Sequence, residues 1–388
     1  MPEAAPPLFP TVLRFGRLGD MVMLTALLRL LQHRYGKPCY VVGAGAWNGP
    51  VFLGHPAVAD SWAFARHLPF EMSLTWPRVL RMLHRSAPGP IYVCEHHPRQ
   101  LKRVRRLLRF SGIDPLRVLY ITEQAGGSDE HWVDRYLRFG EQTPAVPAAG
   151  GYRTRLPLSA WTPKLYVLDT ERVEREAWLR ARGWQGRPLV LVQPGNRRSM
   201  SRRRAELRRL EADDKAWPIS RWVELLRRVH TQVPDALILL CGAPQEGEML
   251  REIENAAGLS AVASAELPLR QLLALCECAH SLISIDTGPA HAAAALGLPL
   301  VVLYGAESPR RWLPRGVADS PILSVGGPPE SHRVDQIRVE AVFAAWMKLA
   351  QSLERTQPRR PLTAFPAERA PAATRSSSRV SLQAPSAD

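Results

Sequence analysis

The chain has 388 residues, of which 46% are hydrophobic, and a formal net charge of +15 from 51 basic and 36 acidic residues. This length exceeds that of a usual single core and the apolar content suffices for two, so we expect two domains. The positive charge predicts an anionic partner, which could be nucleic acid, an acidic membrane surface or a phosphorylated substrate.

The sequence argues against a disulfide-linked protein, a metal-binding protein and a membrane-spanning protein. Five cysteines without a CxxC pair indicate reduced thiols in a cytoplasmic protein. Cys276, Cys278 and His280 would not share a helix face, which argues against a metal site, and we expect neither a metal nor another cofactor. No signal-like start and no run of the ~18–20 apolar residues that span a bilayer are present, so any membrane contact should be peripheral.

The first half begins with a proline-rich arm, a strand over 11–15, a loop over 16–20 and an amphipathic helix over 21–35. Further strands are expected over 39–42 and 91–94. Gly43 and Gly45 resemble a broken dinucleotide fingerprint, but the third glycine is missing and no helix is expected after Asn48, which argues against a nicotinamide site.

A basic segment over 99–110 has leucines and a valine at helical spacing and no acidic residue. Such a helix could lie on an anionic surface, or it could simply present a solvated face. Its basic residues are Arg99, Lys102, Arg103, Arg105, Arg106 and Arg109.

A proline- and alanine-rich linker is expected over 144–163, and the second half again alternates strands and helices, as in doubly wound parallel sheets. Its expected helices are 170–182, 220–229, 247–257, 268–278 and 334–354, and its expected strands are 189–192, 236–240 and 261–263. The arginine-rich run at 197–209 is typical of a mobile solvated loop, and the tail from 357 is expected to be disordered.

The stretch over 280–306 predicts a strand, a tight turn, a short helix over 289–296 and a second strand over 300–304. Free amides at the start of that helix would suit a phosphate at the carboxyl edge of the sheet. Pro289 has no amide N–H, so the donors would be Thr287, Gly288, Ala290 and His291. The alternative is an ordinary turn in which Asp286 caps the helix and His291 packs against it.

Three motifs together resemble glycosyltransferase family 9, the ADP-heptose:lipopolysaccharide heptosyltransferases. They cover residues 14–20, 215–218 and 286–291, and the likeness extends from about 11 to 345. The resemblance implies a GT-B fold, in which two Rossmann-like doubly wound parallel-sheet domains face a cleft. We expect an acceptor domain over 11–160, a nucleotide-sugar domain over 166–335, a C-terminal helix over 336–356 and a disordered tail over 357–388.

The resemblance also implies an inverting transfer of heptose from an ADP-sugar to a lipopolysaccharide core or lipid-linked acceptor. Asp20 would be the general base and Lys215 a catalytic contact to the donor phosphates. Donor-binding residues would be Gln193, Gly195, Lys215, Gly242, Glu246, Asp286, Thr287, Gly288 and His291. Acceptor-binding residues would be Gly19, Arg99, Lys102 and Arg103.

Each assignment has a plainer alternative from the residues alone. Asp20 could be a helix N-cap, Lys215 a surface lysine and Glu246 an exposed acid at a helix start, while Trp217 is expected in the core. The arginine-rich run lengthens the gap before Lys215 beyond the spacing typical of the family. The resemblance therefore does not predict the shape of the donor-binding loop.

Other functions stay open at this stage. The chain could be a GT-B enzyme for another nucleotide sugar, either a UDP-sugar transferase or an epimerase. A basic nucleic-acid-binding protein is disfavoured because the basic segments lack interleaved aromatics and no known nucleic-acid motif is evident. We expect a cytoplasmic protein that touches the anionic inner face of the inner membrane, and an anionic glycolipid as acceptor.

Overall fold

The computed structural model describes residues 8–356 except 66–71, 86–88, 145–155, 197–212 and 318–319. The expectations for the arginine-rich run at 197–209 and for the tail from 357 therefore lie outside the described residues. No helix in the described ranges is both long enough and apolar enough to cross a bilayer.

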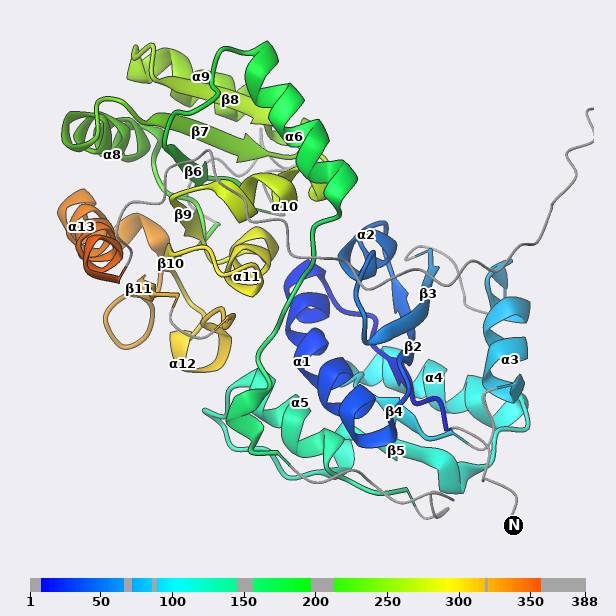
Figure 1. The fold of residues 1–388 in the computed structure, drawn as a ribbon. Coiled ribbons are helices and arrows are strands. Elements are labelled where there is room, and N and C mark those ends of the chain that lie inside the picture. Colours follow the sequence, from blue (N-terminus) through cyan, green and yellow to red (C-terminus); the bar gives the residue numbers. More distant parts are fainter. Residues whose placement is uncertain are drawn as a thin grey trace, which may run out of the picture.

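The first half forms a parallel sheet with the order β3-β2-β1-β4-β5 in the described part of the chain (Figure 1). Its strands are β1 (Thr11–Leu13), β2 (Cys39–Ala44), β3 (Val58–Phe64), β4 (Ile91–Val93) and β5 (Val118–Tyr120). One face is covered by α1 (Leu18–Tyr35), α2 (Asn48–Phe52) and α5 (Trp132–Gly140). The other face is covered by α3 (Trp76–Arg85) and α4 (Pro98–Phe110).

The second half forms another parallel sheet, with the order β11-β10-β9-β6-β7-β8 among the described residues. Its strands are β6 (Leu189–Gln193), β7 (Leu237–Gly242), β8 (Val262–Glu266), β9 (Ser281–Ile285), β10 (Leu300–Tyr304) and β11 (Ile322–Gly326). On one face lie α8 (Ile219–Gln232), α9 (Gly247–Ala257) and α13 (Val339–Thr356). On the other lie α6 (Asp169–Ala181), α10 (Leu269–Cys278) and α11 (Gly288–Ala295), and the short α12 (Pro309–Trp312) packs at its edge.

Each sheet has one point at which the winding direction reverses. In the first sheet it lies between β1 and β4, where Leu13 pairs with Val93. In the second it lies between β6 and β9, where Gln193 pairs with Ser284. Ligands of open α/β sheets bind beyond the carboxyl ends of the strands at such points, so the loops after these four strands are where a site is expected.

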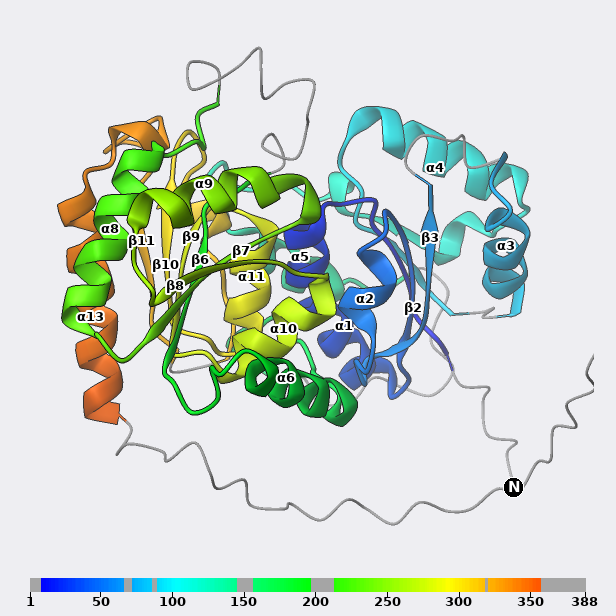
Figure 2. The same cartoon turned by 90° about the horizontal axis from the view of Figure 1, so that it is seen from above.

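The two domains meet through the inner helices of each sheet. Helices α1 and α2 of the first domain contact α11 and α10 of the second, and α5 contacts α12 through Trp132 and Trp312. Helices α1 and α11 lie side by side in both views (Figures 1 and 2). Leu273 of α10 and Ala292 of α11 belong to the same apolar cluster as Val22 and Leu27 of α1. The predicted GT-B architecture of two Rossmann-like domains is thus confirmed, and part of the core is shared between the domains.

The structure differs from the sequence-based expectation at several element ends. Helix α1 begins at Leu18, before the expected residue 21, so Asp20 lies within its first turn and is not the N-cap. A helix does follow Trp47, where none was expected, because Val51 and Phe52 of α2 bury their side chains in the core. The last helix begins at Val339, after a separate short turn over Val334–Gln336.

Candidate active site

The first-domain part of the site is the loop that joins β1 to α1. Asp20 is the third residue of α1, and its Oδ2 accepts a hydrogen bond of 2.7 Å from the backbone amide of Arg17. Its Oδ1 pairs with the Arg14 guanidinium at 2.9 Å. Gly16 is required here, because a Cβ at that position would lie 2.4 Å from the Asp20 Cβ. The loop therefore fixes both oxygens of the carboxylate.

The electrostatic surroundings keep Asp20 ionised. Burial alone would raise the pKa of Asp20, but the Arg14 guanidinium and the Arg17 amide outweigh it, and the pKa lies below its ordinary value. The side chain of Asp20 is 14% exposed. At neutral pH it is thus a carboxylate that can accept a proton from a group that reaches it.

The second-domain part of the site is the turn from β9 into α11. Thr287 is the N-cap of α11, yet its hydroxyl makes no cap hydrogen bond and donates instead to the Ile285 carbonyl at 3.2 Å. In the described part of the chain no hydrogen-bond acceptor is found for the amides of Thr287 and Gly288. The Ala290 amide donates to the Thr287 carbonyl, and the His291 amide lies inside the helix. Two amides at the helix start are therefore available to an anion, fewer than the sequence predicted.

Lys215 lies against this turn. Its Nζ contacts Asp286 Oδ2 at 2.5 Å and the Asp286 carbonyl at 3.3 Å. The backbone amide of Lys215 also donates to Asp213 Oδ1 at 3.1 Å. Asp286 thus holds the ammonium beside the start of α11, and the lysine is not a solitary surface charge. Trp217, two residues on, is buried in the core as expected.

The first turns of α1 and α11 touch each other. A Cβ on Gly19 would lie 2.8 Å from His291 Cδ2, and a Cβ on Gly288 would lie 2.7 Å from the Leu18 Cβ. Both helices therefore direct their positive N-terminal ends at one junction, which favours a bound anion there. Asp20 lies close enough to act electrostatically on His291, whose pKa is lowered by burial.

The remaining donor-site candidates gather at the ends of β6 and β7. Glu246 is 1% exposed, and its Oε2 accepts a hydrogen bond of 2.9 Å from the Ala243 amide. Both glycines face it: a Cβ would lie 1.9 Å from its Oε1 at Gly195 and 3.0 Å from its Oε2 at Gly242. The alternative of an exposed acid is therefore wrong, and Glu246 forms one cluster with both glycines. Gln193, also buried, lies at the end of β6.

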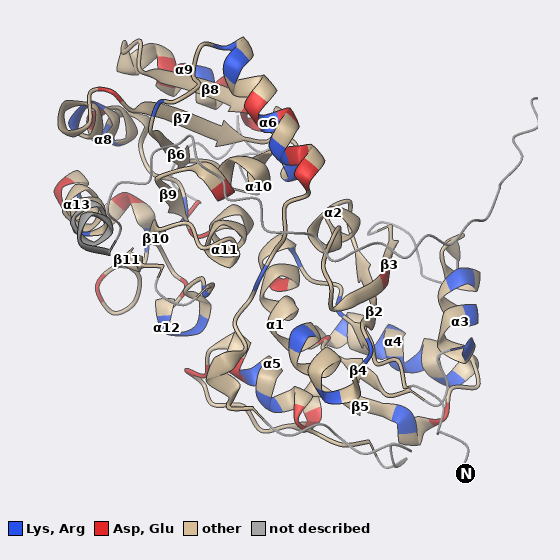
Figure 3. Cartoon of the chain, viewed as in Figure 1, with Lys and Arg blue, Asp and Glu red and all other residues tan. Residues whose placement is uncertain are grey.

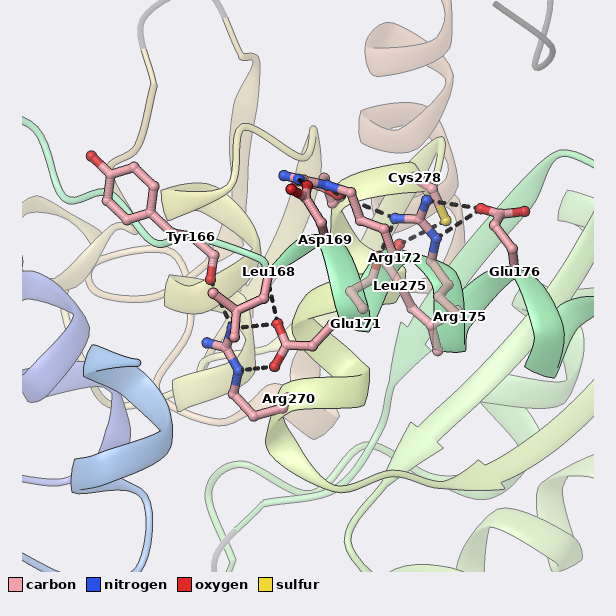
Figure 4. A network of polar contacts seen from close by, with 12 residues as sticks. Tyr166, Leu168, Asp169, Glu171, Arg172, Arg175, Glu176, Arg270, Leu275 and Cys278 are labelled. Carbon is pink, nitrogen blue, oxygen red and sulfur yellow. Dashed lines mark hydrogen bonds and ion pairs between the residues drawn. The ribbon is translucent and has the colours of Figure 1, made fainter. Parts of the chain in front are cut away.

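Ion pairs and hydrogen bonds on both sides of the junction tie the domains together. The Arg270 guanidinium pairs with Glu171 and donates to the Tyr166 carbonyl at 3.0 Å (Figure 4). It also donates to the Pro50 carbonyl of the first domain at 3.0 Å. On the opposite side, Arg315 pairs with Asp134 of α5 at 2.5 Å. These contacts set the distance across which the two parts of the site face each other.

Residues 205–339 match the model of glycosyltransferase family 9 (heptosyltransferase). The lipopolysaccharide heptosyltransferase 2 of Escherichia coli K12 is 26% identical over 316 residues, which cover 75% of this chain and 81% of that protein. Over these residues and in this relative, the chain is similar to glycosyltransferase family 9 (heptosyltransferase).

Solved structures of glycosyltransferases share the fold of this chain. The E. coli ADP-heptose lps heptosyltransferase II has a TM-score of 0.66 at 21% identity, covering 89% of this chain and 100% of that one. The family 9 glycosyltransferase of Veillonella parvula has a TM-score of 0.67 at 17% identity, covering 91% and 100%. Because both sequence identities are below 25%, these structural similarities show the fold alone.

The basic residues assigned to the acceptor by sequence lie on the outer layer of the first domain. Arg99 and Lys102 are exposed on the first turns of α4, and Arg103 is half-buried there. Helices α3 and α4 carry basic residues and no acidic ones (Figure 3). Phe110, at the end of α4, is 72% exposed. The basic residues of α3 and α4 therefore form a cationic layer over one face of the first sheet.

Two residues of the candidate site were not among those predicted from the sequence. Arg14 lies within the first motif, residues 14–20, but its contact with Asp20 was not predicted. Glu95, two residues after the end of β4, pairs with Arg14 at 3.1 Å. A carboxylate that follows a buried strand at the winding reversal is the signal that could have found it. Among the described residues no group of histidine, cysteine or carboxylate side chains could hold a metal ion.

Proposed function

We propose that this protein is an inverting glycosyltransferase that moves heptose from ADP-heptose to a lipopolysaccharide core or lipid-linked acceptor. The observation that carries the proposal is the contact between the first turns of α1 and α11, because it sets an ionised carboxylate of one domain beside an anion-binding helix start of the other. The names of a curated E. coli relative and of a similar solved structure support heptose, lipopolysaccharide and ADP.

In the proposed reaction Asp20 is the general base. Its carboxylate removes the proton from an acceptor hydroxyl while the hydroxyl oxygen attacks the anomeric carbon of the donor sugar. The bond between that carbon and the diphosphate oxygen breaks, and ADP leaves with the bonding electrons. One displacement from the opposite face inverts the configuration of the anomeric carbon.

The charge that develops on the diphosphate is stabilised by the second domain. Lys215 supplies a positive charge, and the amides of Thr287 and Gly288 together with the start of α11 supply hydrogen bonds and a favourable dipole. Asp286 acts by holding Lys215 in place, and His291 by filling the space between the helices. These groups would serve the leaving group without a metal ion.

The cluster at the ends of β6 and β7 is proposed to hold the nucleoside. Glu246 would accept hydrogen bonds from the ribose hydroxyls. Gly195 and Gly242 leave room for its carboxylate, and Gln193 lies at the neighbouring strand end. The winding reversal beside this cluster is the expected position for a nucleotide in such a sheet.

The acceptor is proposed to be an anionic glycolipid bound by the first domain. Gly19, beside Asp20, would face the acceptor where α1 meets His291. Arg99, Lys102 and Arg103 would contact acidic groups of the acceptor. The cationic layer of α3 and α4, with exposed Phe110, suits peripheral contact with the anionic cytoplasmic face of the inner membrane.

Calorimetry with ADP and with UDP tests the donor assignment, and ADP is expected to bind more tightly. Incubation with ADP-heptose and a truncated lipopolysaccharide is expected to release ADP in step with heptose incorporation. Tighter binding of UDP would instead support an enzyme of another nucleotide sugar. Binding of duplex DNA with a steep salt dependence, without nucleotide binding, would support a nucleic-acid-binding protein.

A further inference from the structure

The guanidinium of Arg14 is shared between the buried carboxylate of Glu95 and the mostly buried carboxylate of Asp20. Arg14 is 4% exposed, with Nη2 at 2.9 Å from Asp20 Oδ1 and Nη1 at 3.1 Å from Glu95 Oε1. Glu95 follows β4, which pairs with β1 in parallel, so the two strand ends bring the three side chains together. We call Asp20, Arg14 and Glu95 the carboxylate triad.

Glu95 is held more firmly than an ordinary ion-pair partner. It is 2% exposed, and its Oε1 accepts hydrogen bonds from the amides of His96 at 3.0 Å and His97 at 2.9 Å. Its Oε2 accepts a hydrogen bond of 3.2 Å from the Phe15 amide. These three amides fix both oxygens of Glu95 and hold its carboxylate against Arg14.

Proton transfer to Asp20 changes the net charge of the carboxylate triad from minus one to zero. Before transfer the triad carries two negative charges and one positive charge. After Asp20 has accepted a proton, Arg14 and Glu95 remain as a neutral pair. Without Glu95, the same proton transfer would leave the buried Arg14 with no negative partner, which is costly.

We propose that Glu95 is a positioning residue of the transfer reaction: it keeps Arg14 paired once Asp20 is protonated, so that Arg14 can fix Asp20 without preventing it from acting as a base. This inference rests on the proposed function, because it assumes that Asp20 accepts the proton. Arg14 is the second positioning residue, since it joins the two carboxylates.

Four titratable side chains near the triad have pKa values shifted toward their neutral forms. Burial raises the pKa of Tyr136 on α5 and of Cys94 at the end of β4. Burial, with Arg14 adding to it, lowers the pKa of His96 to about 4, and burial lowers that of His291 on α11. Arg17 contributes its backbone amide, and its side chain is exposed. Among the described residues, the carboxylates that pair with Arg14 are those of Asp20 and Glu95.

Glu95→Gln tests the proposal because it removes the charge and keeps the shape. We expect kcat with ADP-heptose and truncated lipopolysaccharide to fall about 3–10-fold across the neutral range, since a less basic Asp20 is a weaker general base. The dissociation constant of ADP and the melting temperature should stay near those of the wild type. Glu123→Gln, which removes an exposed carboxylate paired with Arg105, is the matched control and should leave kcat unchanged.

A second measurement does not depend on turnover. The carboxyl carbon of Asp20, labelled with carbon-13 and assigned by its loss in Asp20→Asn, is titrated by NMR in Arg14→Gln and in the double variant Arg14→Gln/Glu95→Gln. In Arg14→Gln the titration should move above the ordinary range of aspartate. Glu95→Gln should then move it back down by about one pH unit, because one negative neighbour is gone.

The two measurements separate the inference from the function on which it rests. Identical titrations of the single and double variants, or wild-type kcat in Glu95→Gln, would overturn the role of Glu95. If Asp20→Asn retained wild-type turnover while the titrations shifted as expected, the triad would be real and the assignment of Asp20 as the base would be wrong.

Discussion

Asp20→Asn is expected to lower kcat for heptose transfer by about 10²–10⁴-fold, because a positioned general base contributes that much to the rate. The substitution keeps the side-chain shape, and Arg14 stays paired with Glu95, so the fold should survive. ADP should bind with its wild-type dissociation constant, because the donor residues lie on the other domain. Release of ADP from ADP-heptose in the presence of truncated lipopolysaccharide gives the rate, and calorimetry with ADP gives the affinity.

The matched control for Asp20 is Asp60→Asn, which neutralises an exposed carboxylate of the edge strand β3. Its turnover should equal that of the wild type. An Asp20→Asn enzyme with turnover within a factor of two would contradict the assignment. Loss of ADP binding in that variant would instead show that the residue supports the donor site.

Lys215→Met is expected to weaken ADP binding by roughly 10–150-fold, which corresponds to about 1.5–3 kcal/mol for a charge-assisted contact. The loss has two causes, since the positive charge disappears and the buried carboxylate of Asp286 is left unpaired beside the diphosphate. Calorimetry with ADP measures the change directly. Lower ionic strength should enlarge the difference between the variant and the wild type, because the contact is partly exposed.

Lys348→Met removes an exposed lysine of α13 and is the control for the change of charge. It should leave the ADP dissociation constant unchanged. If Lys215→Met bound ADP as tightly as this control, the diphosphate would lie elsewhere, and the interaction of Lys215 with Asp286 would be purely structural.

The unit from β9 to β10 was predictable because its signals are local. A run of β-branched residues, a turn at Asp286 and Gly288, and alanines at helical positions place two strands and a helix to within one residue. The start of α1 was missed by three residues. Its first turn is fixed by the hydrogen bond between the Arg17 amide and Asp20, and the sequence around Gly19 does not reveal that turn.

Helix α2 was missed for a different reason. Gly49 and Pro50 are typical of a chain break, and the helix exists because Val51 and Phe52 pack into the core beneath α1. Tertiary packing here overrides local preference. The same applies to Glu246, whose burial depends on Gly195 and Gly242, from two neighbouring strand ends.

The carboxylate triad could not be assembled from spacing. Arg14 and Glu95 are 81 positions apart in the sequence, and they meet only because β1 and β4 are neighbours at the winding reversal. Strand order decides which loop ends share an edge, and one sequence of alternating strands and helices allows several orders. The resemblance to a family supplied Asp20, whereas the groups that hold Asp20 came from the structure.

The configuration of the transferred heptose tests the central claim most directly. Proton NMR of the product formed from ADP-heptose and truncated lipopolysaccharide reports the anomeric configuration of the new bond. A single displacement assisted by Asp20, with the leaving ADP held at the start of α11, predicts the configuration opposite to that of the donor. The same configuration as in the donor would contradict the account, because it requires an intermediate or a front-face attack that a single base at this junction does not provide.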